Sequence, residues 1–182
     1  MKVLIAYASR YGATAGVARE LGQVLSNCGH ETAVSRLDEV ESIIDYDAVV
    51  LGSAVYVGRW LKPAREFASR HRKTLAARPV WLFSSGPIGD PPLPAEESPD
   101  AAAIAGEISA RDHRVFRGSL DRERLNLAER VVTQIMGAPQ GYYRDWTAII
   151  EYAMGIHDEL ERMERDRGGA ATPAQLSGED DQ

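Results

Sequence analysis

Three short stretches of the chain are apolar without polar alternation, at residues 3–8, 48–52 and 79–85. Continuous apolar runs of this length are typical of strands that are covered on both faces of a sheet. The stretch "ETAVSRL" at residues 31–37 alternates instead, and predicts an edge strand. A partly apolar run at residues 113–120 predicts a further, shorter strand.

Helical spacing of apolar residues connects these strands, at residues 12–29, 62–77, 101–109, 121–136 and 145–165. Pro63 suits a first helical turn and Gly29 suits a helix C-terminus, whereas residues 38–45 predict a short helix or a turn. One side of the last helix carries Trp146, Ile149, Ile150, Ala153, Leu160 and Met163. The alternation of strands and helices predicts an α/β fold with a parallel sheet between helices.

The domain organisation follows from length and composition. A chain of 182 residues with 44% hydrophobic and 26% charged residues is typical of one globular domain, here residues 1–167. Residues 168–182, "GGAATPAQLSGEDDQ", predict a disordered acidic tail. Half of the net charge of −6 comes from Glu179, Asp180 and Asp181, so the domain is mildly acidic and nucleic acid is not expected as a partner.

The chain has a single cysteine, Cys28, so neither a disulfide framework nor a cysteine metal site is expected, and the cytoplasm is the expected compartment. Cys28 shares a helical face with Val17, Leu21 and Leu25, which predicts a core residue rather than a nucleophile. The four histidines have no metal-ligand spacing. No apolar run approaches the ~18 residues of a membrane span, and no signal peptide is expected.

Ligands of open parallel sheets bind beyond the carboxyl ends of the strands, so the loops that follow the apolar strands are the candidate site. In the first loop, "SRYGAT" at residues 9–14, Gly12 permits close approach to a ligand, and Ser9 and Thr14 supply hydroxyl groups before a helix N-terminus. Such a loop can hold a phosphate through backbone N–H groups and hydroxyls. The alternative is a plain helix cap by Ser9, with Thr14 incidental.

The second loop, at residues 52–63, mixes small residues with Tyr56, Gly58 and Trp60. Small residues beside an aromatic side chain suit a planar heterocycle, although Tyr56 and Trp60 could instead cover the end of the core. The third loop, at residues 84–99, begins with Ser-Ser-Gly and is rich in proline, which predicts a rim or a linker.

None of these loops offers a catalytic nucleophile or a held acid–base pair. A phosphorylated, planar ligand that brings its own reactive centre fits this pattern.

Ser9, Gly12 and Thr14 resemble the phosphate loop of flavodoxins. Within that superfamily, the Ser9-Arg10 pair, "VVLGSAVYVGRWLKPAREFASRH", "RVFRGSLDRERLNLAERVVTQIMGAP" and "DWTAIIEYA" resemble the quinone-linked, menaquinone-dependent protoporphyrinogen oxidases of bacteria. The resemblance covers about residues 1–160 and includes an extra helical segment, residues 121–136, before the last helix.

The resemblance implies a flavodoxin-like three-layer sandwich with a five-stranded parallel sheet of order 2-1-3-4-5, and FMN as cofactor. It implies that the phosphate is surrounded by Ser9, Arg10, Tyr11, Gly12, Ala13 and Thr14. One side of the flavin ring would be lined by Ala54, Val55, Tyr56, Val57 and Gly58, and the other by Ser84, Ser85, Gly86, Pro87 and Ile88. A compact phosphate loop favours FMN over a related deazaflavin.

Three functions stay open at this point. The first is an FMN-dependent oxidoreductase with N5 of the flavin as the redox centre, no catalytic residue of its own, and a quinone or porphyrinogen substrate. The second is an electron carrier that serves a redox protein, which Arg10, Arg59, Lys62 and Arg65 near the expected cleft disfavour. The third is a flavin-free binding or regulatory protein. The segment at residues 121–136 has no aromatic residue, so membrane association is expected to be peripheral at most.

Overall fold

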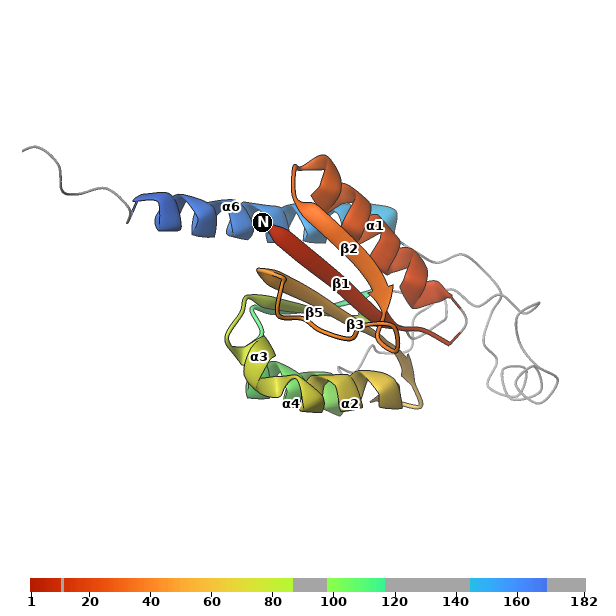
Figure 1. The fold of residues 1–182 in the computed structure, drawn as a ribbon. Helices are drawn as coiled ribbons and strands as arrows, with labels where there is room; N and C mark the ends of the chain where they lie inside the picture. Colours follow the sequence, from red (N-terminus) through yellow and green to blue (C-terminus); the bar gives the residue numbers. More distant parts are fainter. Residues whose placement is uncertain (11, 87–97, 117–144, 170–182) are drawn as a thin grey trace, which may run out of the picture.

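Parallel strands form the central sheet in a computed structural model that describes residues 1–10, 12–86, 98–116 and 145–169 (Figure 1). The strands are β1 (Lys2–Ala8), β2 (Glu31–Arg36), β3 (Ala48–Tyr56), β5 (Val80–Ser85) and β6 (Asp112–Phe116). They pair in the order β2-β1-β3-β5-β6, and the short β4 (Arg59–Trp60) pairs antiparallel with β3. Counted along the parallel strands alone, this is the predicted order 2-1-3-4-5, and the α/β prediction is confirmed.

Helices cover both faces of the sheet and complete a three-layer sandwich (Figure 1). α1 (Ala13–Asn27) and α6 (Trp146–Gly169) lie on one face. α2 (Lys62–Arg70), α3 (Arg72–Ala76) and α4 (Pro99–Ile108) lie on the other. The order of the strands changes direction between β1 and β3, so this fold places its switch point beside the first candidate loop.

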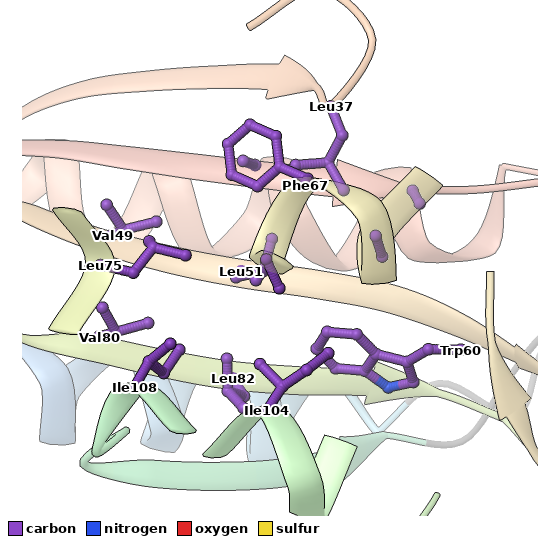
Figure 2. Packing of buried hydrophobic residues seen from close by; sticks show 14 of the residues in the cluster. Leu37, Val49, Leu51, Trp60, Phe67, Leu75, Val80, Leu82, Ile104 and Ile108 are labelled. Atoms are coloured by element: carbon purple, nitrogen blue, oxygen red, sulfur yellow. The ribbon is translucent and has the colours of Figure 1, made fainter. Parts of the chain in front are cut away.

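The apolar strands supply both layers of the core because successive side chains of a strand point to opposite faces. In β5, Val80 and Leu82 pack toward α2, α3 and α4, whereas Trp81 and Phe83 pack toward α1 and α6. Figure 2 shows the first of these clusters, in which Trp60 from β4 also lies. Burial on both faces explains why these strands lack polar alternation.

One predicted helix is divided in the structure. The helix predicted at residues 62–77 is divided at His71, whose φ of −99° and ψ of 11° leave helical geometry. The break leaves Phe67 and Leu75 buried in the same cluster, while the His71 ring packs on Phe67 at 4.5 Å between centroids. Residues 38–45, for which the sequence predicts a short helix or a turn, contain turns.

The buried face of α6 is also displaced from the prediction. Ile149, Ala153 and Leu160 are buried as expected, but Trp146 and Ile150 are exposed. Tyr152 and Ile156 are buried as well. Residues three or four positions apart from Ile149 onward lie on the face of α6 that packs against α1 and the sheet.

Cys28 is a partly exposed residue at the end of α1 rather than a core residue. Its Sγ lies 3.8 Å from Sδ of Met154 on α6. The helical face that buries Leu21 and Leu25 ends with the helix at Asn27, before Cys28.

α6 continues to Gly169, into the first residues of the predicted tail, and residues 170–182 lie outside the described residues. The helix predicted at residues 121–136 also lies outside them. Within the described ranges, no helix has the length and apolar character that crossing a membrane requires.

Candidate functional site

The carboxyl ends of the central strands bring the three candidate loops to one edge of the sheet. Ala8 of β1 pairs with Ser53 of β3, and Ala54 of β3 pairs with Ser85 of β5. The first loop leaves this edge directly after Ala8, the second lies at the end of β3, and the third begins at the end of β5. The grouping of loops that the sequence predicts is therefore present in the fold.

The first loop turns sharply into α1 at Gly12. Gly12 has a φ of 86°, a left-handed conformation that glycine adopts at little cost, and its N–H donates a 3.0 Å hydrogen bond to Oγ of Ser9. α1 begins at Ala13 with no side-chain cap, so the N–H groups of its first turn face the loop. Ser9 therefore stabilises the turn at Gly12 and does not cap the helix. The interpretation of this loop as a plain helix cap also leaves Thr14 unexplained.

Thr14 lies in the first turn of α1 and is fully buried. Its Oγ1 has no hydrogen-bond partner in the structure. A buried, unpaired hydroxyl costs about 1–3 kcal/mol, so it is expected where a bound group supplies the missing partner. A helix N-terminus with a spare hydroxyl and a left-handed glycine fits an anionic phosphate such as that of FMN.

The second loop is a tight hairpin between β3 and β4. Tyr56 pairs with Arg59, and the two residues between them, Val57 and Gly58, have φ values of 51° and 72°. Consecutive positive φ values are the pattern of a type I′ turn, which a β-branched residue adopts at a cost. The turn presents Val57, 85% exposed, and Tyr56, 41% exposed, at the carboxyl edge of the sheet.

Arg10 connects the first loop to this hairpin. Its guanidinium carbon lies 5.0 Å from the centroid of the Tyr56 ring, within the range of a cation–π contact. Loops that are far apart in the sequence thus meet at the edge where the strand order reverses.

The third loop approaches the second through Gly86. The N–H of Gly86 donates a 2.9 Å hydrogen bond to the carbonyl of Phe116, and its φ is 135°. A Cβ at this position would lie 3.4 Å from the carbonyl oxygen of Val55. Ser85 and Gly86 therefore lie beside the second loop.

Ser84 lies at this edge, but its hydroxyl is already engaged within the core. Nε1 of Trp60 donates to Oγ of Ser84 at 2.8 Å, and the same oxygen lies 2.9 Å from Nε2 of His113. Ser84 and Trp60 are both buried. Trp60 therefore covers the end of the core, which is the alternative the sequence left open for it, and Ser84 supports the loop rather than offering a free hydroxyl.

Most of the cations expected near the cleft take part in ion pairs. Arg59 forms a two-pronged pair with Asp100 and Arg65 lies 3.7 Å from the same carboxylate, whereas Lys62 pairs with Glu66 at 3.5 Å. Hydrogen bonds from Arg59, with a further one from the backbone of Trp60, hold the pKa of Asp100 below its usual range. The basic character of this rim is consequently smaller than the sequence suggests.

The remaining predicted site residues divide into two groups. Ala13, Ala54 and Val55 lie on or beside the loops described above. Tyr11, Pro87 and Ile88 lie outside the described residues.

Two arrangements were not foreseen from the sequence. Asp100 lies in the first turn of α4, where an acidic residue suits the helix dipole, and no local signal identifies its partners. His30 and His157 meet at the opposite, amino end of the sheet, with Nε2 of His30 3.1 Å from Nδ1 of His157. Among the described residues, no three histidine, cysteine or acidic side chains gather as metal ligands would.

Comparison with known proteins gives a family match over most of the chain. The model of the flavodoxin domain matches residues 4–146. A protoporphyrinogen IX dehydrogenase [quinone] of Escherichia coli strain K12 is 22% identical over 173 residues, which cover 86% of this chain and 94% of that protein.

Solved structures with the same fold include flavodoxins and part of a longer oxidoreductase chain. A flavodoxin from the domain Archaea has a TM-score of 0.59 at 17% identity, covering 88% of this chain and 99% of its own. Flavodoxin 2 from Bacillus cereus has a TM-score of 0.59 at 22% identity, covering 87% and 99%. Rubredoxin oxygen:oxidoreductase from Desulfovibrio gigas has a TM-score of 0.63 at 16% identity, covering 88% of this chain and 36% of that one.

Proposed function

The chain belongs to the flavodoxin-domain family and takes FMN as its cofactor, and on this premise we propose that it is an FMN-dependent oxidoreductase of the cytoplasm with a small-molecule substrate. A quinone-linked reaction of the protoporphyrinogen oxidase type is the specific form of the proposal. The similarity to a quinone-linked protoporphyrinogen IX dehydrogenase over most of both chains supports this form.

The unpaired, buried Oγ1 of Thr14 is the observation that carries the proposal. With the N–H groups of the first turn of α1, it would hold the phosphate, and Gly12 would let the backbone approach. Tyr56 and Val57 on one side and Ser85 and Gly86 on the other would orient the ring. When bound, FMN supplies a centre that accepts electrons from one substrate and passes them to another.

The exposed apolar rim of the second loop favours a small-molecule substrate. Val57 is 85% exposed and lies beside the aromatic ring of Tyr56, so this part of the rim offers apolar surface. Arg59 and Arg65, which would otherwise give the rim a strong charge, are paired with Asp100. An apolar rim whose positive charge is reduced by Asp100 suits a planar apolar molecule better than a highly charged redox protein.

A flavodoxin-type electron carrier without a substrate of its own is the second candidate. The flavodoxins among the solved structures with this fold favour it. A carrier would exchange electrons with a protein partner at the same edge of the sheet.

Two measurements test these functions in sequence. The first is titration of the purified chain with FMN, which we expect to quench the fluorescence of the flavin; no quenching would exclude both flavin-dependent functions. The second is anaerobic reoxidation of the reduced protein by menadione, a soluble quinone. Rates that saturate with menadione concentration support the enzyme, whereas slow, unsaturable reoxidation supports the carrier.

A further inference from the structure

The carboxylate of Asp100 lies close to donor groups from two elements, β4 and α2. It accepts hydrogen bonds of 2.7 Å from both Nε and Nη2 of Arg59, and a third of 3.1 Å from the backbone N–H of Trp60. Nε of Arg65, on α2, lies 3.7 Å away. The side chain of Asp100 is 12% exposed and that of Arg59 is 58% exposed, so the ion pair is shielded from solvent on its carboxylate side only.

Asp100 binds β4, the second strand of the hairpin that forms the second loop. β4 consists of Arg59 and Trp60, and only two residue pairs join it to β3. A hairpin of this size is not stable by itself, so its conformation depends on contacts with the rest of the fold. Both residues of β4 donate hydrogen bonds to the Asp100 carboxylate.

Two further hydrogen bonds connect β4 and the residue after it to the central sheet. Trp60 donates through Nε1 to Ser84, and the backbone N–H of Leu61 donates to Oγ of Ser53 at 3.0 Å. These bonds anchor the base of the hairpin to β3 and β5. Asp100 differs from them because it also engages the side chain of Arg59, the residue directly opposite Tyr56.

We propose that Asp100 is a positioning residue for the flavin ring, which acts by holding the hairpin in the conformation that presents Tyr56 and Val57 to the ligand. This inference rests on the proposed function, because the hairpin is taken as one wall of the flavin site. When a loop is already ordered in the free protein, ligand binding does not have to offset the conformational entropy lost on ordering it. Losing the Asp100 carboxylate therefore weakens binding of the ring without removing a group that touches it.

The closing experiment compares Asp100→Asn with Asp38→Asn. Asp38 forms a similar two-pronged pair with Nε and Nη2 of Arg36, both at 3.0 Å, after the edge strand β2. The dissociation constants of FMN and of riboflavin, which lacks the phosphate, are measured for each variant by fluorescence quenching. Thermal unfolding of the flavin-free proteins, followed by circular dichroism, identifies variants that remain folded.

For Asp100→Asn we expect dissociation constants about tenfold higher for both FMN and riboflavin, as loss of charged hydrogen bonds would give. For Asp38→Asn we expect changes within about twofold. The visible circular dichroism of the flavin bound to Asp100→Asn should also change, because this signal reports the orientation of the ring within its site.

Three results would overturn the inference: unchanged riboflavin binding in folded Asp100→Asn, equal weakening in Asp38→Asn, or weakening for FMN alone. If Asp100→Asn does not fold, Arg59→Gln tests the same contact from the hairpin side, with the same expectations. Wild-type protein that binds neither flavin would contradict the proposed function itself. If the wild type binds flavin, and neither Asp100→Asn nor Arg59→Gln changes the dissociation constants, only the role of Asp100 is contradicted.

Discussion

The guanidinium group of Arg10 lies over the ring of Tyr56, with 5.0 Å between its central carbon and the ring centroid. This contact joins the loop after β1 to the hairpin after β3 across the point where the strand order reverses. It is a direct side-chain contact between the proposed phosphate loop and the proposed wall of the ring site.

Breaking this contact is expected to uncouple the two loops. In a double-mutant cycle of Arg10→Ala and Tyr56→Leu, we expect a coupling of about 0.5–1 kcal/mol in the free energy of unfolding, measured with urea. Tyr56→Phe keeps the ring face and should retain the coupling. Additive effects of Arg10→Ala and Tyr56→Leu would show that the contact contributes nothing.

Thr14→Val is expected to move stability and FMN affinity in opposite directions. Valine keeps the shape of threonine but removes the unpaired hydroxyl, so the flavin-free protein should gain roughly 1–3 kcal/mol in free energy of unfolding. FMN binding should weaken by about 1–3 kcal/mol, while riboflavin binding stays unchanged. Titration of both ligands and urea unfolding check this, and equal losses for FMN and riboflavin would remove Thr14 from the phosphate site.

The strained turn residue Val57 offers a stabilising substitution. Its φ of 51° is unfavourable for a β-branched side chain, whereas asparagine followed by glycine suits this turn. Val57→Asn should raise the free energy of unfolding by about 1 kcal/mol, and Val57→Ala by less. If Val57→Asn also weakens riboflavin binding, the exposed valine itself contacts the ring.

Two glycines should respond oppositely to alanine. A Cβ on Gly52 would clash with the buried Phe83 ring, so Gly52→Ala should lower the free energy of unfolding by about 1–3 kcal/mol. Gly106, on α4, has open space around it, and Gly106→Ala should raise that free energy by roughly 0.5–1 kcal/mol. Chemical denaturation of both variants tests the pair, and stabilisation by Gly52→Ala would contradict the close packing of β3 against Phe83.

The histidine pair at the amino end of the sheet should make stability sensitive to mild acid. Burial, followed by the positive charges of the N-terminus and His157, lowers the pKa of His30 below 6.5 in the folded chain, against an opposing effect of Glu164 and Glu161. As the pH falls through that value, the unfolded chain takes up the proton first, so the free energy of unfolding falls until the lower, folded pKa is reached.

Urea unfolding between about pH 7 and pH 5 measures this loss. His30→Asn should show a smaller loss than the wild type over this interval, because asparagine does not titrate. Cys28→Ser, a change nearby that leaves both histidines in place, should lose as much as the wild type. Equal losses in His30→Asn and the wild type would contradict the role of His30.

The central strands and the grouping of the loops were predictable because they depend on local pattern. A strand buried on both faces must be apolar throughout, as β1, β3 and β5 are, and parallel strands bring their carboxyl ends to one edge. Gly12 and Thr14 could likewise be singled out, since a loop that holds phosphate needs backbone freedom and a hydroxyl near a helix N-terminus.

The partners of particular side chains were decided by the tertiary structure. Ser84 looked available to a ligand, but the two-residue alternation of β5 turns it toward Trp60 and His113. Arg59 and Asp100 are separated by 41 positions in the chain and meet only because β4 and α4 lie together. Local sequence sets which conformation a segment prefers, whereas contacts between distant segments form only when the sheet and helices assemble. The local pattern therefore predicts the fold and the edge of the sheet where the candidate loops meet, whereas the assembled fold decides which side chains already have partners.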